Sequence, residues 1–246
     1  MTLTPKDILG KISGGRVLDV ATGNGGFIHF LLEGLQGYNE IIGVDNRERG
    51  RAAFEETFKD KPNIHFEIRD ACQLGFEDSS FDMVCISNSL HHLDPEPVLR
   101  EMKRVLRPGG HLLVSEMYRD NQTETQLTHV YLHHWWAAVD RANGVVHRET
   151  YTRQELLDLV TRLGLENEAT YDLADLSGNP HDPVFLAELD PVFERYLQRA
   201  DGHPDLQRRG EELRKRVAEI GFHSATTLIM TGAACYNVVS NSTAQQ

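Results

Sequence analysis

The sequence predicts an α/β protein built on a doubly wound, mostly parallel sheet. From about residue 16 to residue 117, short apolar runs alternate with longer segments of helical period, a pattern typical of βαβ units. A glycine-rich turn joins the first apolar run to an apolar helical segment, which is where the ligand loop of such a sheet is found. These two observations define the fold class, and the individual elements follow from them.

Five runs in this half are short enough to be strands. Three of them are almost wholly apolar, as expected for central parallel strands that are buried on both faces. The third run alternates apolar and polar residues, which favours a half-exposed strand at the edge of the sheet. The five predicted strands are Arg16–Val20, Glu40–Asp45, Asn63–Asp70, Phe81–Ser87 and Gly110–Glu116.

Helix signals separate and flank these strands. Thr4 followed by Pro5 predicts the start of a short first helix, because threonine caps a helix and proline fits its first position. Val98 to Leu106 has helical spacing and is stopped by the turn Arg107-Pro108-Gly109-Gly110.

The second half of the chain is less regular. Its prolines predict loops and short helices over residues 176–205. Thr226–Cys235 is apolar and rich in threonine, and is expected to be a late strand that pairs antiparallel. The remaining predicted elements are helices over 121–142, 152–163 and 205–220 and a strand over Leu165–Leu173.

The composition favours a soluble protein that acts on small molecules. Lys and Arg total 25 against 37 Asp and Glu, so the net charge is −12 and the pI is about 5.4. Such a chain repels phosphate backbones, and no basic patch offsets this, so nucleic acid is not expected as a partner. No apolar run approaches the roughly 20 residues of a membrane span, and no heptad pattern predicts self-association.

A cytoplasmic location is expected. Met1 to Lys11 has neither the apolar core nor the cleavage pattern of a secretory signal. The three cysteines, Cys72, Cys85 and Cys235, are odd in number and widely spaced, which is typical of reduced thiols rather than of disulfides or a cysteine zinc site.

The glycine-rich turn predicts a cofactor loop. Gly23-Asn24-Gly25 follows the first strand, and glycines at such a turn let the backbone approach a ligand closely. A dinucleotide fingerprint would need a third glycine at position 28, which is Ile28. The loop is instead preceded by an acid, Asp19, inside the strand.

Two further acids stand at strand ends. Asp45 ends the second strand, where a carboxylate can accept hydrogen bonds from a ribose diol. Asp70 and Ala71 end the third strand and suit the edge and face of a purine. Because the carboxyl ends of parallel strands meet at one edge of the sheet, these acids predict a nucleoside site.

With these motifs, residues 16–118 resemble class I S-adenosylmethionine-dependent methyltransferases. Asp19, Gly23 and Gly25 match the first motif of that family, while Ala21 replaces its first glycine, as it often does in the similar quinone-biosynthesis enzymes. The resemblance implies S-adenosyl-L-methionine as cofactor. It implies a seven-stranded sheet of order 3-2-1-4-5-7-6 whose last strand is antiparallel.

The resemblance also implies a single Rossmann-like domain over residues 1–246, with helical lid insertions over 119–150 and 176–220. Within it, Asp45 would bind the ribose, and Asp70 with Ala71 the adenine. The predicted cofactor-binding residues are Asp19, Ala21, Gly23, Asn24, Gly25, Asp45, Asn46, Asp70, Ala71 and Ser87.

The fourth strand is followed by two histidines at the expected reacting end of the site. His91 or His92 can act as a general base, because imidazole titrates near neutrality. Alternatively, one lines the cofactor and the other caps the next helix. His133, on the predicted helix 121–142, is a third catalytic candidate.

The predicted helix 121–142 carries two further alternatives. His129 and His133 stand at i and i+4 and can share a metal, with Asp140 or His147 as a third ligand, but no closed ligand set is visible and no metal is predicted. The same side chains can instead contact the substrate or solvent. Tyr131, Trp135 and Trp136 can form an aromatic wall for a substrate, although core packing explains Trp135 equally well.

The predicted function is methyl transfer from S-adenosylmethionine to a small-molecule acceptor by in-line displacement, with catalysis arising mainly from positioning. The resemblance to quinone enzymes points to a ring carbon or oxygen as the acceptor atom. Two alternatives stand beside this prediction. One is a catalytically silent protein that binds S-adenosylmethionine. The other is an NAD-dependent oxidoreductase, which is disfavoured because position 28 is isoleucine rather than the third glycine of a dinucleotide fingerprint.

Overall fold

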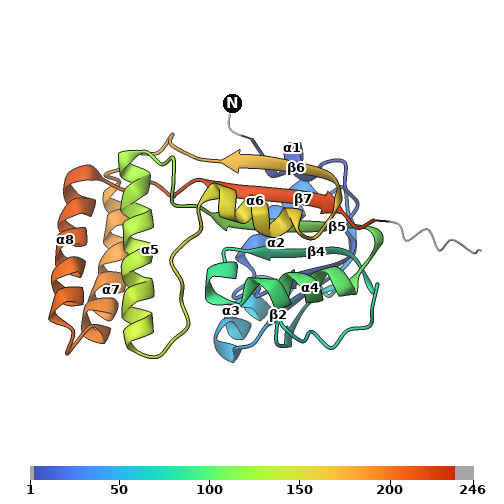
Figure 1. Cartoon of the computed structure of the whole chain (residues 1–246), viewed down its shortest axis with the longest axis horizontal. Helices are drawn as coiled ribbons and strands as arrows, with labels where there is room; N and C mark the ends of the chain where they lie inside the picture. Colours follow the sequence, from blue (N-terminus) through green and yellow to red (C-terminus); the bar gives the residue numbers. More distant parts are fainter. Residues whose placement is uncertain (1–2, 236–246) are drawn as a thin grey trace, which may run out of the picture.

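The computed structural model describes residues 3–235 and contains one seven-stranded sheet. The strand order is β3-β2-β1-β4-β5-β7-β6, which confirms the predicted order (Figure 1). Strands β1 to β5 pair in parallel, and β7 pairs antiparallel with both β5 and β6. The strands are β1 (Gly15–Val20), β2 (Tyr38–Asp45), β3 (Ile64–Ile68), β4 (Phe81–Ser87), β5 (Leu106–Met117), β6 (Glu166–Leu173) and β7 (Thr227–Ala233).

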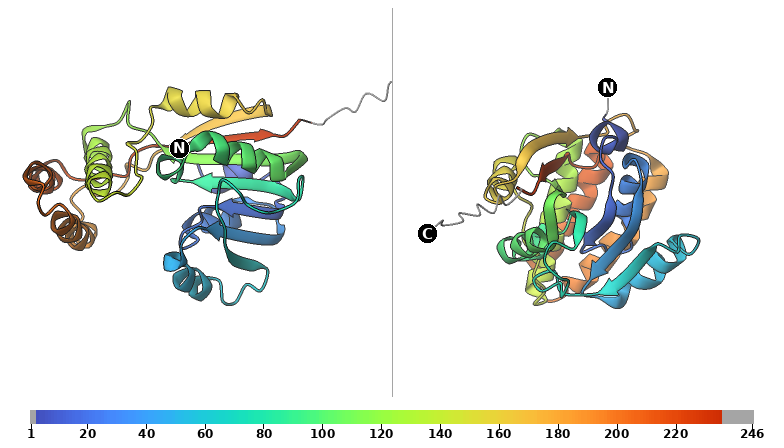
Figure 2. Two further views of the ribbon diagram at one scale, coloured as in Figure 1. Left: turned by 60° about the horizontal axis from the view of Figure 1, so that its bottom comes forward. Right: turned by 90° about the vertical axis from the view of Figure 1, so that its right-hand side faces the viewer.

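Helices cover both faces of this sheet, which confirms the doubly wound fold class (Figure 2). One face packs against α4 (Pro95–Val105) and α6 (Arg153–Thr161). The other packs against α1 (Pro5–Leu9), α2 (Gly26–Gly34) and α3 (Arg51–Thr57). The central strands β1 and β4 are buried on both faces, whereas β3 forms the predicted edge of the sheet.

Three further helices lie together beyond the carboxyl ends of the parallel strands (Figures 1 and 2). They are α5 (Glu124–Ala142), α7 (Pro183–Arg199) and α8 (Pro204–Ile220). Their shared core centres on Trp135, which is fully buried and donates a hydrogen bond from Nε1 to the Leu206 carbonyl at 2.8 Å. Within residues 3–235, no helix is both long enough and apolar enough to cross a membrane.

The expectation of loops and short helices over 176–205 is wrong for most of that stretch. Residues 183–199 form one helix, α7, with Pro183 in its first turn and Pro191 inside it. Pro191 removes one helical hydrogen bond, but Leu189 and Phe193 bury their side chains in the core around Trp135. Tertiary packing therefore outweighs the helix-breaking tendency of proline.

Candidate active site

The loop between β1 and α2 has a backbone that favours glycine. Gly23 and Gly25 have φ of 57° and 83°, both in the left-handed region. A Cβ on Gly25 would lie 2.5 Å from the Phe58 ring, so any other residue would require this ring or the loop to shift. Ala21, which stands where the similar family carries glycine, also has a positive φ of 55°, a conformation that strains a residue with a Cβ.

Asp45 connects the end of β2 to this loop. Its Oδ2 accepts a hydrogen bond from the Gly23 amide and its Oδ1 one from the Arg47 amide, each at 3.0 Å. The carboxylate is therefore held in place at the cleft by backbone donors. Each oxygen retains a further lone pair that can accept a bond from a ribose hydroxyl.

Asp19 is a buried carboxylate on the other side of the loop. Its side chain accepts a hydrogen bond from the Thr22 hydroxyl at 2.6 Å and lies 3.5 Å from the Cys85 thiol. Burial raises the pKa of Asp19 to about 6, because removal from water penalises the charged form more than these hydrogen bonds stabilise it. A cationic group bound beside Asp19 would stabilise its charged form.

Two clefts meet at the loop. The first, of about 340 Å³, extends from Asp45 to His92, and the second, of about 370 Å³, lies beside Asp19. Ala21 and Asn88 line both clefts. The first cleft is lined by Ala21, Gly23, Val44, Asp45, Asn46, Arg47, Arg69, Ala71, Asn88, Ser89, His92, Leu93, Asp140 and Val145.

Most of the predicted cofactor residues lie at these clefts. Asn46 and Ala71 line the first cleft, and Asn24 and Ser87 line the second. Asp70 is not among the described residues that line either cleft, and its Oδ1 accepts a hydrogen bond from the Cys72 amide at 2.8 Å.

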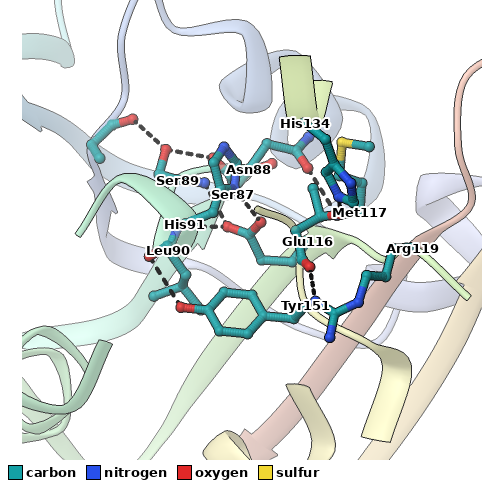
Figure 3. Close-up of polar contacts among 12 residues, drawn as sticks. Ser87, Asn88, Ser89, Leu90, His91, Glu116, Met117, Arg119, His134 and Tyr151 are labelled. Atoms are coloured by element: carbon teal, nitrogen blue, oxygen red, sulfur yellow. Dashed lines mark hydrogen bonds and ion pairs between the residues drawn. The ribbon is translucent and has the colours of Figure 1, made fainter. Parts of the chain in front are cut away.

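The two histidines after β4 have different surroundings. They belong to a single helical turn, η2 (Leu90–His92). His92 lines the first cleft, whereas His91 is 1% exposed and directs Nδ1 to the Glu116 carboxylate at 3.1 Å (Figure 3). The other oxygen of Glu116 accepts hydrogen bonds from the Ser89 and Leu90 amides, so this buried acid fixes the whole turn.

Two more histidines approach this turn from the helical layer. His133 comes from α5 and His147 from the segment that follows it. His133 packs edge-on against His91 at a ring separation of 4.6 Å, and His147 lies 4.0 Å from the ring of His92. Burial lowers the pKa of His92 to about 3 and that of His133 still further, with the neighbouring imidazoles as a second cause.

His129, one of the two metal candidates from the sequence, is not part of this group. Its Nδ1 accepts a hydrogen bond from the Ala225 amide at 2.9 Å, and its ring packs against Phe222. Burial lowers the pKa of His129 to about 4. His129 therefore does not belong to the group of histidines that includes His133, although helical spacing suggests that the two form a metal-binding pair.

The three aromatic residues of α5 also differ in role. Trp135 is a core residue, as one of the two alternatives predicted. Tyr131 is 38% exposed, with the Arg216 guanidinium over its ring. Trp136 stacks on Tyr196 and packs against His133, next to the histidines.

Sequence reasoning missed several residues of the site. Asn88, Ser89, Arg47 and Arg69 line the first cleft. Asn88 directly follows Ser87, and its positive φ of 44° is one that asparagine tolerates. Glu116 is predicted only as the end of a strand, and its full burial beside His91 is a tertiary feature that the sequence does not show.

Part of the chain is similar to known methyltransferases. The family model of the methyltransferase domain matches residues 18–114. Among curated relatives, a demethylmenaquinone methyltransferase of Staphylococcus haemolyticus is 37% identical over 112 residues, which cover 45% of this chain and 46% of that protein. The match therefore spans about half the length of the relative.

Solved structures share the fold across nearly the whole chain. The cyclase SpnF superposes with a TM-score of 0.62 at 18% identity, covering 94% of this chain and 79% of that one. Phosphoethanolamine N-methyltransferase 2 of Haemonchus contortus, solved with S-adenosyl-L-methionine, gives a TM-score of 0.55 at 18% identity, covering 91% and 49%. At 18% sequence identity, these similarities show that the fold is shared.

The cofactor loop, Asp45 and the paired clefts fit S-adenosylmethionine, a ligand with a nucleoside at one end and an amino acid at the other. They lie within or beside the segment that the family model matches. Residues 18–114 match the model of a methyltransferase domain, and this segment is similar to curated methyltransferases.

Proposed function

We propose that the protein transfers the methyl group of S-adenosylmethionine to a small-molecule acceptor. The observation that carries this proposal is that Ala21 and Asn88 line both clefts, while His92 and Asp140 line the first cleft. In the reaction, a lone pair of the acceptor attacks the methyl carbon, the carbon–sulfur bond breaks, and its electron pair stays on sulfur. An acceptor hydroxyl or amine releases its proton.

The cofactor would lie across the loop. Asp45 would bind the ribose diol, with Asn46 and Ala71 beside the nucleoside in the first cleft. In the second cleft, the Asp19 carboxylate would face the ammonium group of the amino-acid end, with Asn24 and Ser87 nearby. The loop residues Ala21 to Gly25 would bring the backbone close to the ligand. Asp70 would affect adenine binding only indirectly, because its carboxylate accepts a hydrogen bond within the turn that follows β3.

The acceptor would bind between the cofactor and the helical layer. We assign His92 the direct contact, because among His91, His92 and His133 it is the one that lines the cleft. With its pKa near 3, the ring is neutral at pH 7 and contacts the acceptor uncharged. Residues 119–150 and 176–220 would act as lids of one domain, and the first of these segments brings Asp140 and Val145 to the cleft wall.

The acceptor class follows from the charge and the relatives. A net charge of −12 disfavours nucleic acid, and the curated relative is named for a quinone-type acceptor, so a ring compound is the first choice. We further propose a cytoplasmic location, which the exposed free thiols of Cys72 and Cys235 support, because such thiols persist in a reducing compartment.

Calorimetry with S-adenosylhomocysteine and with NAD tests the cofactor assignment. The wild type is expected to bind S-adenosylhomocysteine and not NAD, and Asp45→Ala is expected to lose at least about tenfold in affinity, as for the removal of a charged hydrogen-bond partner. Asp60→Ala, an exposed acid away from the cleft, is the matched control. Binding of NAD in place of S-adenosylhomocysteine would refute the proposal.

A methyl-transfer assay with labelled S-adenosylmethionine and a panel of ring hydroxyl, amine and quinol acceptors tests turnover. Labelled product that depends on Asp45 is the expected result. Tight binding of the cofactor without product across the whole panel would support a silent binding protein instead.

A further inference from the structure

Four histidines converge at the end of the cofactor cleft. One ring nitrogen each from His91, His92, His133 and His147 lies within 4.8 Å of the other three. The four residues come from three separate segments, namely the η2 turn, helix α5 and the chain that follows α5. The Arg148 amide donates to the His91 carbonyl at 2.8 Å, which joins the last segment to the turn.

Two buried carboxylates orient two of these rings. Glu116 accepts from Nδ1 of His91 at 3.1 Å, and Asp140 accepts from Nδ1 of His147 at 2.7 Å. In each ring the Nε2 atom is thereby left as the unprotonated nitrogen with a free lone pair. A carboxylate that fixes the tautomer of a histidine in this way is the usual second layer of a protein metal site.

Three of the four histidines have a buried ring nitrogen without a hydrogen-bond partner. Nε2 of His91, Nε2 of His147 and Nδ1 of His133 are all buried, and none has a hydrogen-bond partner among residues 3–235. An unpartnered buried polar atom costs about 1–3 kcal/mol. Three such atoms in one group therefore indicate a ligand that they share.

We propose that His91, His92, His133 and His147 bind one divalent transition-metal ion, with zinc as the reference ion. Imidazole nitrogen is a preferred ligand of zinc and of its neighbours in the first transition row. A tetrahedral zinc site has N···N edges of about 3.4 Å, so the widest gap here closes by at most about 1.4 Å through small ring rotations.

Two buried carboxylates stand beside the cluster. Glu116 and Asp140 contribute two formal negative charges, of which Arg199 offsets one. Arg199 contacts the outer oxygen of Asp140 at 2.6 Å, so the inner oxygen remains directed at His147.

The position of the ion gives it a role that rests on the proposed function. His92 and Asp140 also line the first cleft, so the ion would lie at the end where the acceptor binds. An acceptor hydroxyl would enter as a fifth ligand, to which a zinc site can expand, and the ion would lower its pKa so that its proton passes to water. The resulting oxyanion would attack the methyl carbon, and the carbon–sulfur electron pair would leave with sulfur.

Metal content and zinc calorimetry on protein without a histidine tag test the inference directly. After chelation and dialysis, the wild type is expected to bind one zinc ion per chain. His133→Ala and His147→Ala are each expected to weaken this affinity at least about 100-fold, since they remove a ligand. His129→Ala, on the same helix but outside the cluster, and His65→Ala, on the edge strand, are expected to bind zinc as the wild type does.

A second variant series separates metal binding from a loss of folding. His133→Gln keeps a neutral polar side chain of similar size, so it is measured alongside His133→Ala, with circular dichroism and S-adenosylhomocysteine binding as controls. Glu116→Gln changes the partner of His91 Nδ1 and is expected to lower zinc affinity by about 10- to 100-fold. Absence of stoichiometric zinc binding, or binding that survives in folded His133→Gln and His147→Ala, overturns the inference.

These readouts are independent of methyl transfer. Zinc binding without turnover would leave the metal site standing and refute the proposed function. Cofactor binding and turnover that persist in chelated protein, with no zinc bound on titration, would refute the metal site and leave the proposed function intact.

Discussion

Gly25 lies so close to Phe58 that a Cβ on the glycine would be 2.5 Å from the ring edge. Phe58 packs edge-on against Phe54, and both belong to the core on one face of the sheet. The backbone of the cofactor loop therefore packs closely against the aromatic core. This contact fixes the distance between the loop and the sheet.

Gly25→Ala is expected to destabilise the protein by at least about 2 kcal/mol, because it adds a steric clash to a positive φ. Gly23→Ala shares the positive φ but meets no atom within 4 Å, so about 1 kcal/mol is expected. Chemical denaturation measures both, with the exposed Gly178→Ala as a control. Equal losses at the two loop positions would contradict the role of the Phe58 contact.

Asp19 makes stability and cofactor affinity respond to pH in opposite directions. Its pKa is raised from 3.8 to about 6 in the folded protein, so the folded state binds the proton more tightly than the unfolded state. The unliganded protein therefore loses up to about 3 kcal/mol as pH rises from about 4 to above 6. Asp19→Asn is expected to remove this slope in denaturation curves.

Affinity for S-adenosylhomocysteine is expected to increase over the same range, because charged Asp19 attracts the ammonium group in the proposed pose. Calorimetry between about pH 5 and pH 8 measures this change. An affinity that is flat with pH in the wild type would place the ammonium group away from Asp19.

The two adjacent tryptophans of α5 are expected to respond differently to truncation. Trp135→Ala empties the core of the helical layer and is expected to cost about 3–5 kcal/mol of unfolding free energy. Trp136→Ala is expected to raise KM for the acceptor while the affinity for S-adenosylhomocysteine stays unchanged, because Trp136 borders the histidines. Equal losses of acceptor and cofactor binding in Trp136→Ala would assign it a structural role.

Two prolines of α7 are expected to affect the stability of the protein differently, because they occupy different positions in the helix. Pro191 stands inside the helix, so Pro191→Ala restores one backbone hydrogen bond and is expected to stabilise the protein by about 1–2 kcal/mol. Pro183 occupies the first turn, where the missing amide has no helical partner, and Pro183→Ala is expected to change stability by less than about 0.5 kcal/mol. Thermal melting compares the two. A destabilised Pro191→Ala would mean that the helix requires the proline at this position.

The sheet could be predicted from the sequence because its signals are local. The apolar character of β1 reflects burial on two faces. The alternation in β3 agrees with burial at Ile64 and in part at Phe66, whereas Ile68 is 41% exposed. The strand order came from a resemblance carried by Asp19, Gly23 and Asp45. Helix α7 was missed because its stability comes from contacts of Leu189 and Phe193 with other helices.

The sequence predicted the four histidines as candidates but not the cluster that they form, for a related reason. The sequence predicts His147 as a possible third ligand beside His133, but helical spacing pairs His133 with His129, one turn away. The structure pairs it instead with His91, from a turn that precedes it by some forty residues. Spacing along one element cannot reveal a site assembled from three segments.

The place of β7 has a consequence for how the chain folds as it is synthesised. β7 inserts between β5 and β6, yet it is made only after the whole helical layer. Until β7 emerges, the apolar flank of β5 has no strand beside it, and unpaired strand edges of this kind attract other chains. Completion of the sheet is thus expected to be a late and slow step, at which a nascent chain depends most on chaperones.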